Sequence, residues 1–356
     1  MKISSLQVGR GIAAVLVVLY HVTVYGADEF NYLLFNNLFA FGYAGVDFFF
    51  VLSGFIIFYV HARDIGHRDK LTAYFSKRLI RVYPIYWAVT TAKLIAIFLI
   101  PSIAKDYEKY LSVIIYSYLL IPQVNHPIVA PAWTLSYEMS FYLLFGMAIW
   151  LGHRLAKVLL ITWVSIILIY TLARTFNLIE RPDSHLILFL LNERNLEFTL
   201  GLLSAYIVMQ HKLAYQELML VLGCVLFGIS GWYAVSIHDQ VSSYTLLFGI
   251  PALLIVVSSV SLERKRNITF PAWLVFIGDA SYSIYLTHSM FINLSNLVLQ
   301  RLEKVVEIPP GLALPGVALA AVLGGCLVYF YVERPLLAFL RHVFTQKKPL
   351  DAAPSH

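Results

Sequence analysis

The stretch RGIAAVLVVLYHV, residues 10–22, combines an apolar run long enough to enter a lipid bilayer with an arginine at its start and a histidine farther along. Ionisable groups inside a bilayer cost about 2.5–3.5 kcal/mol each on insertion scales, so they usually mark a polar cavity. Arg10 and His21 are eleven residues apart, so a helix places them on one face, about 16 Å apart along its axis. The stretch therefore predicts a membrane helix whose polar stripe runs from one rim of the bilayer toward its middle.

The rest of the chain has the composition of an integral membrane protein. Of its 356 residues, 60% are apolar and 13% are charged, whereas about 25% charge is usual in a soluble domain. Crossing a hydrocarbon core of about 30 Å takes about 20 apolar residues. We therefore expect an all-α protein with about ten transmembrane helices, at residues 8–25, 38–60, 84–100, 132–151, 158–173, 187–209, 218–234, 244–261, 282–299 and 313–332.

Two shorter segments complete the expected organisation. Residues 111–121 are apolar but too few to span a bilayer, so we interpret them as a re-entrant or interfacial piece. The sequence shows neither an internal repeat nor a linker, which predicts one transmembrane domain over residues 1–345. Residues 346–356 form a short polar tail, which we expect to be cytoplasmic.

The net charge of +6 follows the rule that positive residues gather on the cytoplasmic side. With both termini cytoplasmic, eighteen of the 26 lysines and arginines fall on the inner side, six fall in outer loops and two lie within helices. This distribution indicates a lipid bilayer and no nucleic acid as the partner of the basic residues. The two cysteines, Cys224 and Cys326, lie in separate apolar runs, which indicates packing residues; we expect neither a disulfide nor a bound metal.

Three of the other ionisable residues within predicted membrane helices are candidates for the site. Asp47 lies in GVDFFFVLSGF, Glu138 in WTLSYEMSFY and His288 in SYSIYLTHSM. The expected depths of Asp47 and Glu138 approach that of His21, so we expect Glu138, or alternatively Asp47, to orient the His21 imidazole. A purely structural role, as a polar clamp between helices, remains open for each of these residues.

A basic cluster precedes the third predicted span, in SKRLIRVYPIYW. Arg78 and Arg81 are three residues apart and share a helix face, and Lys77 is adjacent. Guanidinium groups present a planar donor fork that suits phosphate, so the cluster is a candidate phosphate site. Membrane topology alone would also account for it. Since Pro84 is tolerated at a helix start, we expect the basic turn to come before the spanning part.

Taken in order, these motifs, together with the closing YVERP, resemble the integral-membrane acyltransferase family 3. The similarity covers nearly the whole chain and is greatest to bacterial enzymes that O-acetylate exopolysaccharide and O-antigen. It implies a protein of the bacterial inner membrane that transfers an acyl group, usually acetyl from acetyl-CoA, to a sugar hydroxyl. By motif match, His21 takes the position of the family's catalytic histidine and Arg10 that of its paired arginine. The sequence contains no fused hydrolase-like domain, so we expect the saccharide acceptor to meet the membrane domain directly.

This resemblance and the residues together predict a mechanism. Arg10, Lys77, Arg78 and Arg81 would hold the phosphates of acyl-CoA, while His21 acts as general base or as a transient acyl carrier. Four further residues are expected to contact the saccharide, namely Trp133, Tyr137, Tyr142 and His288. A transporter or flippase for a lipid-linked sugar or a small anion is the alternative, because central charges can also bind cargo without chemistry. The length of the acyl group, the acceptor sugar and the oligomeric state stay open.

Overall fold

A computed structural model describes residues 3–237 and 245–345, and in these residues every regular element is a helix, as expected. The predicted tail, and residue 244 of one predicted span, lie outside the described residues. The α-helices are α1 (Ser4–Phe30), α2 (Gly45–His61), α3 (Leu71–Leu99), α4 (Leu111–Leu119), α5 (Trp133–Leu151), α6 (His153–Thr175), α7 (His185–Leu190), α8 (Arg194–Gln210), α9 (Gln216–Ile237), α10 (Ile250–Arg266), α11 (Ala272–Leu302), α12 (Pro310–Val328) and α13 (Arg334–Thr345).

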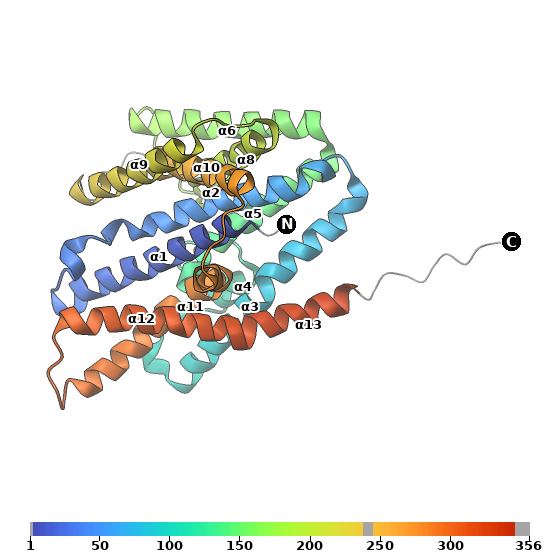
Figure 1. Ribbon diagram of the computed structural model, residues 1–356. Helices are drawn as coiled ribbons and strands as arrows, with labels where there is room; N and C mark the ends of the chain where they lie inside the picture. Colours follow the sequence, from blue (N-terminus) through green and yellow to red (C-terminus); the bar gives the residue numbers. More distant parts are fainter. Residues whose placement is uncertain (1–2, 238–244, 346–356) are drawn as a thin grey trace.

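Within the described residues, seven helical segments are long and apolar enough to cross a membrane. They are Ser4–Phe30, Ala40–Asp64, Arg68–Leu99, His153–Thr175, Gln216–Ser236, Leu247–Arg266 and Pro310–Val343. The chain is therefore a multi-pass membrane protein. The other three predicted spans correspond to α5, α8 and α11, which lie in the same bundle (Figure 1) and carry buried polar side chains such as Ser136, Glu197 and His288.

Several predicted helix boundaries differ from the structure: α2 begins at Gly45 and not at residue 38, and α11 begins at Ala272 and not at residue 282. Two further differences bear on the candidate site. Helix α3 begins at Leu71 instead of Pro84, because the helix continues through this proline. The basic residues Lys77, Arg78 and Arg81 therefore lie within the first turns of α3. The prediction had placed them before this helix. The predicted span 187–209 is broken at residues 191–193 into α7 and α8, where the buried Asn195 amide donates hydrogen bonds to the carbonyls of Phe189, Leu190 and Asn192.

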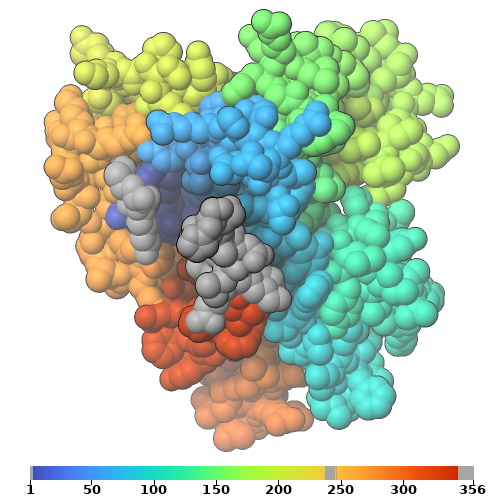
Figure 2. Space-filling view, turned by 90° about the vertical axis from the view of Figure 1, so that its right-hand side faces the viewer, coloured from blue at the N-terminus to red at the C-terminus, as the bar shows by residue number. Residues whose placement is uncertain are grey.

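The bundle is built around α1, which packs against α2, α11 and α12. Both described ends of the chain lie at one end of the bundle, on the right of Figure 1, which Figure 2 shows face on. The connection from α2 to α3 and the turn from α5 to α6 lie there too (Figure 1). The end of α10 is held beside the start of α1, because the Glu263 carboxylate accepts hydrogen bonds from the Ser4 and Ser5 amides. We call this end of the bundle the basic end, since it carries Arg63, Arg68, Lys70, Arg154, Lys157, Lys212, Arg264, Lys265 and Arg266.

Helices α2 and α8 cross with their backbones in contact, which requires glycine in both. A Cβ atom built on Gly201 would lie 2.1 Å from the Val51 carbonyl oxygen, and one on Gly54 would lie 2.1 Å from the Phe198 carbonyl oxygen. Small residues at such crossings permit close packing of membrane helices.

We expect Gly201→Ala to destabilise the protein by about 1–3 kcal/mol, because overpacking a well-packed contact forces the two helices apart. The matched control is Gly228→Ala in α9, where a Cβ atom would meet nothing within 4 Å. Thermal unfolding of the detergent-purified variants measures the difference. Equal melting temperatures for the two variants would contradict the close crossing.

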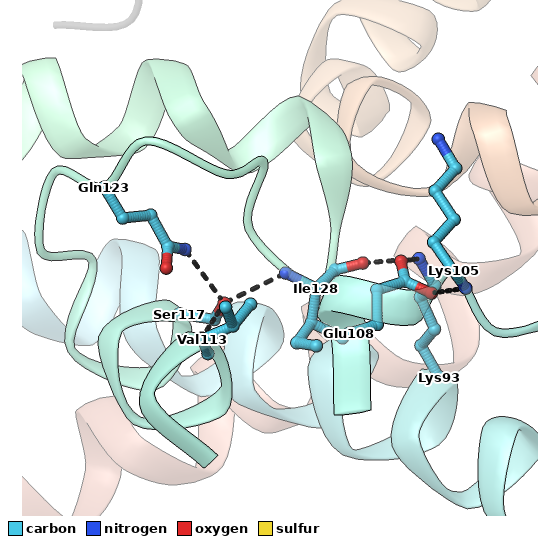
Figure 3. Close-up of polar contacts among 7 residues, drawn as sticks. All are labelled: Lys93, Lys105, Glu108, Val113, Ser117, Gln123 and Ile128. Atoms are coloured by element: carbon cyan, nitrogen blue, oxygen red, sulfur yellow. Dashed lines mark hydrogen bonds and ion pairs between the residues drawn. The ribbon is translucent and has the colours of Figure 1, made fainter. Parts of the chain in front are cut away.

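The predicted short segment at 111–121 forms α4, a helix of nine residues that is too short to span a bilayer. A polar network joins it to the loop that follows (Figure 3). The Ser117 hydroxyl accepts hydrogen bonds from the Ile128 amide at 2.9 Å and from the Gln123 side chain at 3.3 Å. The Lys93 ammonium group contacts both the Glu108 carboxylate, at 2.6 Å, and the Ile128 carbonyl. These bonds fix the loop of residues 120–131 over the end of the bundle opposite the basic end.

Candidate active site

A cavity of about 130 Å³ lies between α1, α2, α3, α5 and α11. We call it the inner cavity. Its polar wall consists of the guanidinium groups of three arginines, a carboxylate and several hydroxyl groups, contributed by Arg10, Arg78, Arg81, Glu138, Ser53, Thr134, Tyr142, Ser281, Tyr282 and Tyr285. The predicted clustering of Arg10 with the two arginines of α3 is thus present in the structure.

The three arginines differ in their partners. Arg81 Nη1 lies 2.6 Å from the buried carboxylate of Glu333, so the charge of this arginine is compensated. Arg10 donates a hydrogen bond from Nε to the Ser281 hydroxyl at 3.2 Å. The Arg78 guanidinium lies over the Tyr142 ring, 5.7 Å from its centroid. In the described residues neither Arg10 nor Arg78 forms an ion pair, so both can receive an anion.

Glu138 belongs to the inner cavity and not to the surroundings of His21. It accepts hydrogen bonds from the Tyr142 hydroxyl and from the Ser53 hydroxyl, the latter at 3.2 Å. Asp47 is fully buried, and its carboxylate lies 3.7 Å from Arg194 Nε of α8. Asp47 and Gly54 are seven residues apart and share the face of α2 that packs against α8. The structure therefore brings neither carboxylate to His21, contrary to our expectation.

A second cavity, of about 550 Å³, lies on the side of the bundle away from the basic end and contains His21. We call it the outer cavity. Its polar lining consists of Tyr20, His21, Asn37, Tyr43, His126, Trp133, Arg194, Tyr285 and Ser289. His126 comes from the loop that the network of Figure 3 holds in place. A cavity of this size and polarity suits a hydrated, uncharged or weakly charged ligand.

The orientation of His21 is fixed by its own helix. Nδ1 lies 2.8 Å from the Val17 carbonyl oxygen, which can only accept, so Nδ1 carries the hydrogen. The second nitrogen, Nε2, is then the basic one. The His288 ring lies beside the His21 ring, with 4.6 Å between the centroids, and donates from its own Nδ1 to the Tyr285 carbonyl. The neighbour of His21 is thus a second imidazole.

The two cavities meet at Val46 and Tyr285, which line both. The Tyr285 hydroxyl donates to the Pro131 carbonyl at 3.1 Å and contacts the Thr134 hydroxyl at 3.0 Å, so this side chain is held between the cavities. Along α1, Arg10 in the inner cavity and His21 in the outer cavity are about 16 Å apart. The polar stripe predicted for α1 therefore runs from the arginines of the inner cavity to the imidazole of His21 in the outer cavity.

The remaining predicted residues fall in different places. Trp133 lines the outer cavity, under the Arg194 guanidinium at 5.3 Å. Tyr142 lines the inner cavity. Tyr137 lines neither of the two and packs against Phe189, while Lys77 is exposed on α3. Within residues 3–237 and 245–345, no group of three or more His, Cys, Asp or Glu side chains is placed to hold a metal ion.

Among the residues at the two cavities that sequence reasoning missed, Glu333 and Tyr285 have the clearest structural roles. Glu333 accepts from Arg81 and, at 2.6 Å, from the Ser283 hydroxyl. It lies in YVERP, and a carboxylate at the end of an apolar run was the signal that could have identified it. Tyr285 lies in SYSIYLTH and resembles any tyrosine of a membrane helix, so no signal in the sequence separated it from the rest.

An all-helical membrane protein in which an arginine-lined cavity lies beside a half-buried histidine has the features of a membrane-embedded transferase. The chain belongs to the membrane acyltransferase family 3: the family model described as an acyltransferase domain matches residues 3–330. The match confirms the family that the sequence motifs indicated. The family identity makes the protein an acyltransferase.

Two characterised relatives extend along most of the chain. The exopolysaccharide production protein ExoZ of Rhizobium meliloti (strain 1021) is 28% identical over 313 residues, which cover 84% of this chain and 90% of that protein. The acyltransferase MdmB of Streptomyces mycarofaciens is 25% identical over 388 aligned residues, which cover 99% of this chain and 95% of that protein. No solved structure gives a significant match.

Proposed function

We propose that this protein transfers an acyl group, acetyl in the simplest case, from acyl-CoA to a hydroxyl group of a cell-surface or lipid-linked saccharide. The observation that carries the proposal is the pair of cavities that meet at Val46 and Tyr285, one with arginines and one with His21. The similarity to a relative named for exopolysaccharide production supports a saccharide acceptor.

The proposed orientation follows from charge. Positively charged residues favour the cytoplasmic side of a membrane, and they gather at the basic end, where α1 begins and α13 ends. We therefore place both termini in the cytoplasm of a bacterium, with ten spans in its inner membrane. Acyl-CoA then arrives at the inner cavity and the acceptor at the outer cavity.

The donor site combines positive charge with a narrow route inward. Arg10 and Arg78, which form no ion pair within residues 3–237 and 245–345, bind the phosphates of the nucleotide, and Arg81 is held in place by Glu333. The thioester arm follows α1 past Val46 and Tyr285 to His21, over the roughly 16 Å that separate the two residues of the stripe. Glu138 fixes the Tyr142 ring beneath the Arg78 guanidinium.

The chemistry depends on His21. In direct transfer, Nε2 takes the proton of the acceptor hydroxyl as its oxygen attacks the thioester carbonyl. The carbon–sulfur bond then breaks, and the proton passes from the imidazolium to the thiolate, which leaves as CoA. In the alternative, Nε2 attacks the thioester carbonyl first, the carbon–sulfur bond breaks and CoA leaves as the thiolate. The acceptor hydroxyl then takes the acyl group from the transient acyl-histidine, which restores Nε2, and the hydroxyl proton passes to the thiolate. The outer cavity holds the saccharide, with Trp133 offering a ring on which a sugar can stack.

Removal of positive charge from the donor site should weaken CoA binding. A hydrogen bond to a charged group contributes about 1.5–3 kcal/mol, so Arg78→Gln and Arg10→Gln should each raise the Kd for CoA by roughly 10- to 150-fold. The matched control is Arg63→Gln, an exposed arginine at the same end of the bundle. Equilibrium binding of CoA to purified protein measures the effect. An unchanged Kd in the Arg10→Gln/Arg78→Gln double variant would show that these arginines do not bind CoA and serve only to orient the protein in the membrane.

The proposed reaction is tested by incubating membranes that contain the protein with acetyl-CoA labelled in the acetyl group. We expect label in the polysaccharide fraction together with an equal amount of free CoA. A transporter or flippase would move the saccharide without releasing CoA. Polysaccharide isolated with and without the protein should also differ in its O-acetyl signals by NMR.

A further inference from the structure

A third cavity, of about 590 Å³, lies between α5 and α6. We call it the lateral cavity. Helix α6 closes it along the edge of the bundle, and α2 and α8 contribute the remaining wall (Figure 1). Its lining is almost entirely apolar, with Phe141 and Phe145 from α5 and Leu160 and Trp163 from α6. Such a space excludes water, because water needs two to four polar partners.

The lateral cavity is as deep as one leaflet of a bilayer. It extends along α6 from His153, at the basic end, to Trp163. Ten residues of helix correspond to about 15 Å, which is half of the hydrocarbon thickness of about 30 Å. The apolar space therefore begins at the membrane surface and ends near the midplane.

Two basic side chains stand at the mouth of the lateral cavity. His153 and Lys157 line it and are four residues apart, so they share a face of α6. In the described part of the chain, the Lys157 ammonium group forms no ion pair, although Lys70, Lys93, Lys109 and Arg266 do. An uncompensated cation at the surface end of an apolar, leaflet-deep cavity matches the charge pattern of a phospholipid, in which a phosphate caps an acyl chain.

We propose that the lateral cavity binds an anionic phospholipid from the leaflet at the basic end. One acyl chain lies between α5 and α6, down to Trp163, and the headgroup phosphate contacts Lys157 and His153. The bound lipid couples to the site through α5. This helix lines the lateral cavity with Phe141 and Phe145 and the inner cavity with Glu138 and Tyr142, which lie on neighbouring faces. The proposal concerns lipid binding and holds whether or not the acyl transfer proposed above is correct.

The position of Trp163 provides a direct test. The purified full-length protein in detergent is titrated with phosphatidylglycerol or phosphatidylcholine brominated in the acyl chains, and quenching of tryptophan fluorescence is recorded. Five other tryptophans contribute, so the same titration of Trp163→Phe isolates the signal of the cavity. We expect saturable quenching of Trp163 by both lipids, with an affinity about fivefold higher for phosphatidylglycerol, since a basic residue near an anionic lipid contributes about 1 kcal/mol.

Two variants and one control distinguish specific lipid binding in the lateral cavity from nonspecific contact with lipid. Lys157→Ala should remove the preference for phosphatidylglycerol, whereas Lys212→Ala, an exposed lysine at the same end outside the cavity, should keep it. Ala148→Phe, which places a ring inside the cavity, should abolish the Trp163 signal for both lipids. Equal affinity for the two lipids in the unmodified protein, or no effect of either variant, would overturn the proposal. Tighter competition by polyprenyl phosphate than by phosphatidylglycerol would also overturn it, since the occupant would then be a lipid-linked substrate.

Discussion

Replacement of His21 by alanine is expected to lower the rate of acyl transfer by about 10²–10⁴-fold, the usual contribution of a positioned acid–base group. The loss would be larger if the acyl group passes through His21 covalently. The imidazole lines the outer cavity with Nε2 free of its own helix, because Nδ1 is bonded to the Val17 carbonyl. The rate of label transfer from acetyl-CoA to polysaccharide measures the effect at matched protein levels.

The control for this experiment is His67→Ala, which removes an exposed imidazole outside both cavities and should leave the rate unchanged. CoA binding separates chemistry from folding, because the donor site lies about 16 Å from His21 along α1 and should survive the substitution. Transfer at the wild-type rate by the His21→Ala protein would remove His21 from the mechanism.

Loss of Glu333 is expected to have the largest effect on stability. Its carboxylate is fully buried and receives hydrogen bonds from Arg81 and Ser283, each at 2.6 Å. Removal of one partner of a buried ion pair costs about 3–5 kcal/mol, since it leaves the other charge uncompensated. Glu333→Ala should therefore sharply lower the free energy of unfolding, measured from the loss of helical circular dichroism in mixed micelles.

A double variant identifies the cause. Arg81→Met together with Glu333→Leu removes both charges and fills their space, and replacing a buried pair in this way is often neutral or stabilising. The double variant should therefore recover most of the stability lost in Glu333→Ala. Glu303→Ala, which removes an exposed carboxylate, serves as the control. A Glu333→Ala protein as stable as the control would show that Glu333 does not compensate Arg81.

The features that depend on one helix were predictable from the sequence. The spacing of Arg10 and His21 fixes their shared face on α1, and the two residues line neighbouring cavities that share Val46 and Tyr285 as lining residues. The all-helical fold followed from composition, because apolar spans of about 20 residues satisfy their backbone groups only as helices or closed barrels. The family resemblance likewise rested on short motifs that occur in order along the chain.

The features that depend on contacts between helices were not predictable. Glu138 was expected beside His21 from its depth alone, but its rotation about α5 turns it toward Tyr142 and Ser53. Arg81 and Glu333 are 252 residues apart, so no local pattern pairs them. Asp47 was likewise expected beside His21 from its depth alone, but it lies on the face of α2 that packs against α8, near Arg194.

The central claim is that acyl-CoA reaches His21 from the basic end through the inner cavity. A structure of the protein with a non-hydrolysable acyl-CoA analogue tests it most directly. We expect the phosphates of the analogue in hydrogen-bond contact with Arg10 and Arg78. Its acyl carbonyl should lie beyond Val46 and Tyr285, next to His21 Nε2. An analogue bound with its phosphates away from these arginines, or with its acyl group in any place other than the outer cavity, would contradict it.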